Sequence, residues 1–160
     1  MTAVTLCHAF MLPAKLFAAL AAFFAILAGL ARAVPSPGID LYVHSTAFVL
    51  GPTLVLIFCV FSSANFAVLY YAGDRTFHVS WNRPLTLLHF VLFLYFGVSL
   101  SLLFAFSIRV ANAGPSGEPM DWIIVSGFLG IFSLIVSFVV FAINLTIAVV
   151  QLVRTRTVTR

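Results

Sequence analysis

The chain has 160 residues, of which 63% are hydrophobic and only 8% are charged. A soluble domain is about 45–50% apolar and about 25% charged, so the charged residues are too few to coat a soluble surface, and the mean hydropathy of +1.19 agrees. The composition predicts an integral membrane protein and excludes an intrinsically disordered chain. With no charged run or long linker, we expect residues 1–160 to form one membrane domain.

Four charge-poor segments are each long enough to cross a bilayer as a helix, which takes about 20 apolar residues. None of them alternates with the two-residue period of a barrel strand. The sequence therefore predicts an all-α, four-transmembrane-helix bundle, with helices at about 12–33, 45–72, 84–108 and 122–153. Pro52 falls inside the second of these helices and is expected to kink it.

The first segment has the features of a cleavable signal peptide. Lys15 precedes an apolar run, and Ala31-Arg32-Ala33 follows it. Cleavage and retention are both compatible with these residues. If the segment is retained, it forms the first helix and acts as a signal anchor.

The basic residues are distributed unevenly between the two ends of the predicted helices. Cytoplasmic loops of membrane proteins carry an excess of Lys and Arg, which favours both termini on the inner (cytoplasmic or matrix) side. This orientation leaves Arg32 and Arg109 outside. It places six basic residues inside, namely Lys15, Arg75, Arg83, Arg154, Arg156 and Arg160.

Two predicted helices carry a face of small or weakly polar residues, which allows close helix approach in lipid. At 100° per residue, the face of segment 122–153 consists of Ser126, Gly130, Ser133, Ser137, Asn144 and Gln151. The face of segment 12–33 consists of Ala18, Ala22, Ala25 and Gly29. We expect both to pack against helices, either within the bundle or on a neighbouring subunit. Alternatively, the face of segment 122–153 lines a polar path.

Three polar side chains are predicted at a similar depth in the inner half of the bundle. They are Asn65, His89 and Asn144. Because an unpaired polar group in hydrocarbon costs several kcal/mol, we expect these three to form one buried polar layer.

The chemistry needed for transport or catalysis is missing from the predicted spans. No Asp or Glu lies inside them, whereas pumps and carriers depend on such groups. No metal-binding Cys/His cluster and no catalytic motif occurs. We therefore expect no enzyme activity of its own, no metal and no cofactor, and neither nucleic acid nor a soluble small molecule as partner. Membrane lipids, including a structural lipid, and other integral membrane subunits are the expected partners.

Histidine offers the one route to haem. His89 and His44 are the candidate ligands, but they fall at different depths of the predicted bundle. A bis-histidine site between them is therefore not expected, and a haem shared with a partner chain stays open.

The layout resembles the MARVEL-type tetraspan proteins, which share the chain length, four spans, both termini inside and aromatic-rich spans such as 87–106. This resemblance implies a role in organising membrane patches or vesicle traffic. A fainter resemblance is to the first four helices of haem–copper oxidase subunit I. It rests on His44 and on the series Asn65, Gly73, Asp74, Phe77 and Asn82. The helices that bear the copper ligands are absent from this sequence, so no haem site is carried over.

These observations predict a non-catalytic, multi-pass membrane protein that serves as an accessory subunit packed against a larger membrane complex. If that complex is an oxidoreductase, the chain is a part of it that does not itself catalyse the reaction. A MARVEL-like membrane organiser and a haem b-binding electron-transfer subunit are the alternatives. The mitochondrial inner membrane, an endomembrane or plasma membrane, and a bacterial inner membrane all fit the sequence.

Overall fold

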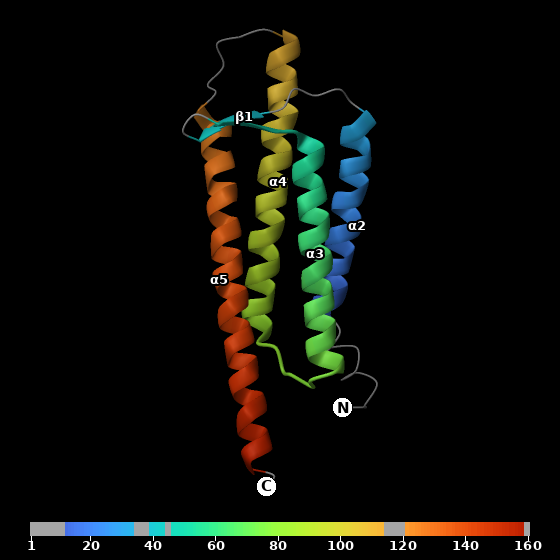
Figure 1. The fold of residues 1–160 in the computed structure, drawn as a ribbon, viewed down its shortest axis with the longest axis vertical. Coiled ribbons are helices and arrows are strands. Elements are labelled where there is room, and N and C mark those ends of the chain that lie inside the picture. The colour runs from blue at the N-terminus through green and yellow to red at the C-terminus, as the bar shows by residue number, and fades with distance from the viewer. Residues whose placement is uncertain (1–11, 34–38, 44–45, 114–120, 159–160) are drawn as a thin grey trace.

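The computed structural model describes residues 12–33, 39–43, 46–113 and 121–158. Its helices are α2 (Leu12–Ala33), α3 (Pro52–Arg75), α4 (Arg83–Ala113) and α5 (Asp121–Val158). They stand side by side and alternate in direction along the chain, as Figure 1 shows. Consequently α2 begins and α5 ends at the same end of the bundle, which we call the lower end.

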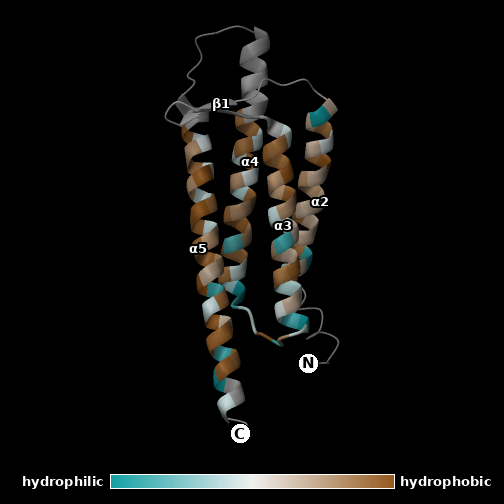
Figure 2. Cartoon of the chain, in the orientation of Figure 1, coloured by the Kyte–Doolittle hydropathy of each residue, from teal (hydrophilic) through white to brown (hydrophobic). Residues whose placement is uncertain are grey.

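All four helices are long and apolar enough to cross a membrane, and Figure 2 shows hydrophobic residues throughout the coloured part of each. Many large apolar side chains point outward. Phe61, Phe128 and Phe132 are among the most exposed. A four-helix architecture suited to a bilayer is therefore confirmed.

The second helix begins later than the sequence predicted, so the expected start near residue 45 is wrong. Residues Thr46–Leu50 form strand β2, which pairs antiparallel with strand β1 (Ile39–Val43). Pro52 then occupies the first turn of α3, after an extended Gly51. A proline fits this position because its missing N–H is not needed there, and it also favours an extended residue before it. Pro52 thus starts the helix and does not kink it.

The core lies where two helix pairs meet. Helix α2 packs along α3, and α4 packs along α5. The buried cluster between them is rich in aromatic rings, including Phe17, Phe24, Phe66, Tyr70 and Phe93. Edge-to-face and tilted contacts join these rings; the Phe17 and Phe66 ring centroids, for example, are 5.4 Å apart. Such pairs add packing energy beyond the area they bury.

The segment 76–82 closes the lower end of the bundle between α3 and α4. His78 has a positive φ of 51°, which reverses the chain. The N–H of Val79 then donates to the carbonyl of Gly73 at 3.0 Å. Next to it, the Trp81 indole lies directly on Gly73, where a β-carbon would collide with the ring. A glycine is therefore needed at this position to let the loop fold back on α3.

Candidate functional site

A cluster of bonded polar side chains, buried except for Asn82, lies in the lower half of the bundle. We call Tyr70, Asn82, Thr86, His89 and Asn144 the polar cluster. Tyr70 comes from α3, Asn82 from the connecting loop, Thr86 and His89 from α4, and Asn144 from α5. Tyr70, His89 and Asn144 are fully buried, and Thr86 is nearly so.

Asn144 ties α5 to the start of α4. Its Oδ1 accepts from the backbone N–H of Asn82 at 3.0 Å, and its Nδ2 donates to the Thr86 hydroxyl at 2.9 Å. The Thr86 hydroxyl in turn donates to the Asn82 carbonyl at 3.0 Å. Asn82 also caps α4, because its Oδ1 accepts from the N–H of Leu85 at 3.2 Å. The amide of Asn144 thus fixes both the loop and the helix that follows it.

Tyr70 and His89 link α3 to α4. The Tyr70 hydroxyl and the His89 Nδ1 are hydrogen-bonded at 3.0 Å, with the donor set by the histidine tautomer. Because His89 lies on α4 one turn after Thr86, this bond connects Tyr70 to the rest of the polar cluster. On the α5 side, the Ser137 hydroxyl donates to the His89 carbonyl at 3.3 Å.

Aromatic rings enclose the imidazole of His89. Its centroid lies 4.7 Å from that of Phe17, 4.4 Å from that of Phe66 and 5.2 Å from that of Phe141. The Nε2 atom is buried and has no hydrogen-bond partner among the described residues. An iron ion could reach Nε2 only if these rings moved aside.

The sequence-predicted polar layer forms only in part. His89 and Asn144 lie buried in the polar cluster, but Asn65 is exposed on the outer side of α3. The helical period explains this difference, because Asn65 is five residues before Tyr70 and points away from the face that Tyr70 and Phe66 share. Tyr70 takes the place that the sequence assigned to Asn65.

The small-residue face of α5 lies mainly inside the bundle. Gly130, Ser133, Ser137 and Asn144 are buried, and Ser126 is half-buried. A β-carbon on Gly130 would come within 2.8 Å of the Ser99 β-carbon on α4.

At the lower end of the same helix, Gln151 is exposed. Its Oε1 accepts from the Ser80 hydroxyl at 2.7 Å. The face therefore serves contacts with α4 and with the loop.

The small-residue face of α2, in contrast, points away from the interior of the bundle. Ala18, Ala22, Ala25 and Gly29 are all exposed. No atom lies within 4 Å of a β-carbon built on Gly29. Helix α2 instead packs into the bundle through larger residues, above all Phe17, Leu20 and Phe24.

The other histidine of the described residues does not share the buried surroundings of His89. His78 is exposed on the loop, and His44 lies outside the described residues. No group of three His, Cys, Asp or Glu side chains suited to a metal ion occurs in the part of the chain that the structure describes.

Two features of the site were missed by sequence reasoning. Tyr70 was read as part of an apolar run, although a buried tyrosine usually needs a hydrogen-bond partner. Gly97 on α4 was not singled out, yet the ring of Phe24 from α2 occupies the space where a β-carbon would stand. The glycine alone carried too weak a signal, because its partner lies on another helix.

No protein family model, curated protein or solved structure matches this chain.

Proposed function

We propose that this chain is an integral, multi-pass membrane protein that catalyses no reaction and serves as an accessory subunit of a larger membrane complex. In this proposal both termini lie on the inner side, so that the lower end of the bundle, with Lys15, Arg75 and Arg83, faces the cytoplasm or matrix. The excess of positive charge at this end supports that orientation.

The observation that carries the proposal is the contrast between the interior and the outer surface. The polar groups of the polar cluster bond across α3, α4 and α5 and thereby hold the bundle together. The described outer faces are mainly apolar and bear large side chains such as Phe61, Phe128 and Phe132. A protein built this way acts through contacts of its helix faces within the bilayer.

The exposed small-residue face of α2 is the proposed partner surface. Interfaces between membrane helices are enriched in small residues, because these let two backbones approach closely. Since α2 already uses Phe17, Leu20 and Phe24 for the bundle, its small-residue face remains available for a helix of another subunit.

Purification of the full chain in mild detergent from its own membranes tests the proposal. Wild type is compared with Ala22→Leu and with Ala19→Leu. Both alanines are exposed, but Ala19 lies about 60° around α2 from Ala22 and about 90° from the centre of the small-residue face. We expect a stoichiometric integral membrane partner that is lost from Ala22→Leu and kept by Ala19→Leu.

The same preparation separates the alternatives. An oligomer of this chain alone would contradict the accessory role and favour a self-associating, MARVEL-like membrane organiser. A Soret absorption band that follows this chain would favour haem at His89, with displacement of the rings of Phe17, Phe66 and Phe141.

A further inference from the structure

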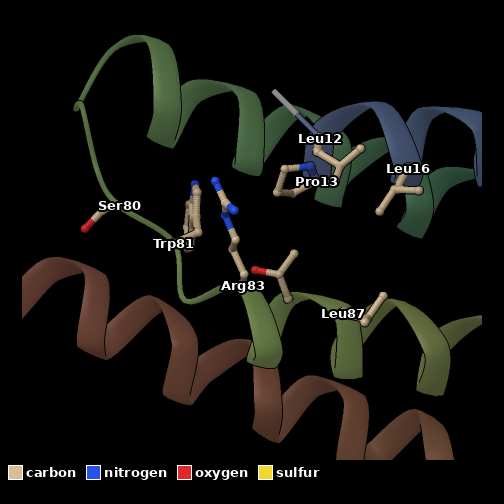
Figure 3. Close-up of a pocket in the computed structure, with 8 residues that line it drawn as sticks. Leu12, Pro13, Leu16, Ser80, Trp81, Arg83 and Leu87 are labelled. Carbon is tan, nitrogen blue, oxygen red and sulfur yellow. The ribbon is translucent and has the colours of Figure 1, made fainter. Parts of the chain in front are cut away.

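A cavity of about 310 Å³ opens at the lower end of the bundle, between the first turns of α2 and α4. Leu12 and Leu16 on α2 and Leu87 on α4 form its apolar wall, and Trp81, Arg83 and Thr86 complete the lining. In Figure 3, Leu12 and Leu16 lie across the cavity from Arg83 and Leu87. Its position follows from the packing: α2 rests mainly on α3 and α4 mainly on α5, so the seam between α2 and α4 is filled less completely. The loop with Trp81 closes this seam from below.

The cavity has charge on one side only. Arg83 is exposed, extends from the start of α4 toward the start of α2 in Figure 3, and forms no ion pair with any described carboxylate. Lys15, also exposed, lies on the first turn of α2 at the same end. The Thr86 hydroxyl is already engaged, since it donates to Asn82 and accepts from Asn144. Arg83 is thus the charged group of the lining that is left to bind an anion.

The apolar wall continues deeper into the bundle than the charge. Leu87 stands one turn above Arg83 on α4, and Leu16 stands one turn above Leu12 on α2. One turn of helix advances about 5.4 Å. Leu12 and Leu87 are 56% and 57% exposed, so they leave the mouth of the cavity open to the hydrocarbon. Charge at the surface with apolar side chains beneath it matches the order of parts in a phospholipid.

We propose that this cavity binds one anionic glycerophospholipid, with its phosphate on Arg83 and the first methylenes of its acyl chains against Leu12, Leu16 and Leu87. The planar guanidinium of arginine binds phosphate oxygens in pairs, and basic pockets between membrane helices on the inner side bind anionic head groups. A volume of 310 Å³ takes the head-group region and the start of the chains, with the remainder of the lipid in the bilayer. The inference rests on the membrane placement proposed above.

Native mass spectrometry of the full chain tests this binding. The chain is purified in detergent and equilibrated with equal amounts of phosphatidylglycerol and phosphatidylcholine, and the retained lipids are counted. Four single variants form two matched pairs. Arg83→Gln is paired with Arg75→Gln, which removes an exposed charge at the same end but outside the cavity. Leu87→Trp, which narrows the mouth, is paired with Leu88→Trp, an exposed neighbour that does not line the cavity.

We expect wild type to retain one phosphatidylglycerol in preference to phosphatidylcholine. Arg83→Gln should lower this occupancy about five-fold, the effect of one basic group near an anionic membrane surface, whereas Arg75→Gln should keep it. Leu87→Trp should lower retention and Leu88→Trp should not. Because a free phosphate ion does not need the apolar wall, the effect of Leu87→Trp identifies the ligand as a lipid.

Three results would overturn the inference. They are equal retention of the two lipids, equal losses in Arg83→Gln and Arg75→Gln, and unchanged retention in Leu87→Trp. Circular dichroism of each variant confirms that the helices are formed. Alkaline carbonate extraction of the source membranes is done first. Release of the chain by carbonate would contradict the proposed function itself, whereas a chain that stays in the membrane without lipid selectivity contradicts only the lipid inference.

Discussion

The lower and upper halves of the bundle hold their helices together in different ways. In the lower half, the polar cluster makes hydrogen bonds across three helices, through Tyr70, His89 and Asn144. In the upper half, the contacts between helices depend on the size of the side chains that meet. The Phe24 ring covers Gly97, and Ser99 lies against Gly130.

The serine hydroxyls of the upper half illustrate this difference. The Ser133 hydroxyl donates to the carbonyl of Gly130 at 2.6 Å, and the Ser101 hydroxyl donates to that of Gly97 at 2.7 Å. Each bond stays within its own helix. A hydroxyl that bonds to its own helix needs no partner across the interface, so the helices can approach closely without an unsatisfied polar group. Substitutions should therefore act through volume in the upper half and through hydrogen bonding in the lower half.

The largest effect is expected from Gly97→Ala. Its new methyl group would collide with the buried ring of Phe24, and overpacking of this kind costs about 1–3 kcal/mol. Gly29→Ala is the matched control, because nothing lies within 4 Å of its β-carbon. Thermal unfolding in detergent, followed by circular dichroism, measures both. Equal midpoints for the two variants would show that the upper half tolerates an added methyl group. Packing by size would then not distinguish the upper half from the lower half.

Asn144→Leu should have the next largest effect, a destabilisation of about 1–2 kcal/mol. Loss of the amide leaves the part-buried N–H of Asn82 without its acceptor and removes the bond that the buried Thr86 hydroxyl accepts. Asn65→Leu is its control, since Asn65 is exposed and a leucine there suits lipid. The same unfolding measurement applies. Loss of stability in Asn65→Leu that equals the loss in Asn144→Leu would place Asn65 inside the bundle after all.

Tyr70→Phe should cost less, about 0.6 kcal/mol, the average for a hydrogen bond between membrane helices. The ring stays, and only the bond to His89 Nδ1 is lost. Tyr71→Phe on the exposed side of α3 is expected to have no effect. Urea-assisted unfolding in detergent resolves a difference of this size. A Tyr70→Phe variant as stable as Tyr71→Phe would show that the polar cluster does not stabilise the contact between α3 and α4.

Ser133→Ala should change stability least, because its hydroxyl bonds to its own helix and the smaller methyl group fits the same space. We expect a midpoint within error of wild type in the same assay. A marked loss would mean that Ser133 bonds across the interface and that the upper half also depends on hydrogen bonds.

The sequence was sufficient to predict the four helices, because long charge-free segments have few other solutions in a chain this apolar. The start of α3 was not predicted correctly. Residues Thr46–Leu50 are as apolar as the helix that follows, so hydropathy did not separate the strand from the helix. The combination of Gly51 and Pro52 was the local signal for the boundary.

The residues of the candidate site were predictable only where the spacing along a single helix determines which side chains are buried. The face of α5 with Ser133, Ser137 and Asn144 follows from helical spacing alone, and these residues are buried. The partners of Asn144 depend on how the loop at Asn82 folds back, which no single segment encodes. For α2, two faces fitted the rule for helix packing, and only the packed bundle shows that the side with Phe17 and Phe24 is the inner one.

Cross-linking from α2 is the most direct test of an accessory subunit that binds its partner through the small-residue face. A photoreactive amino acid is placed at Ala22 in the full chain, in intact membranes, and at Ala19 as the control. The proposal predicts one discrete protein adduct from Ala22, with a membrane protein other than this chain, and none from Ala19. Adducts with lipid alone at both positions would contradict it, because the face of α2 would then be covered only by the bilayer.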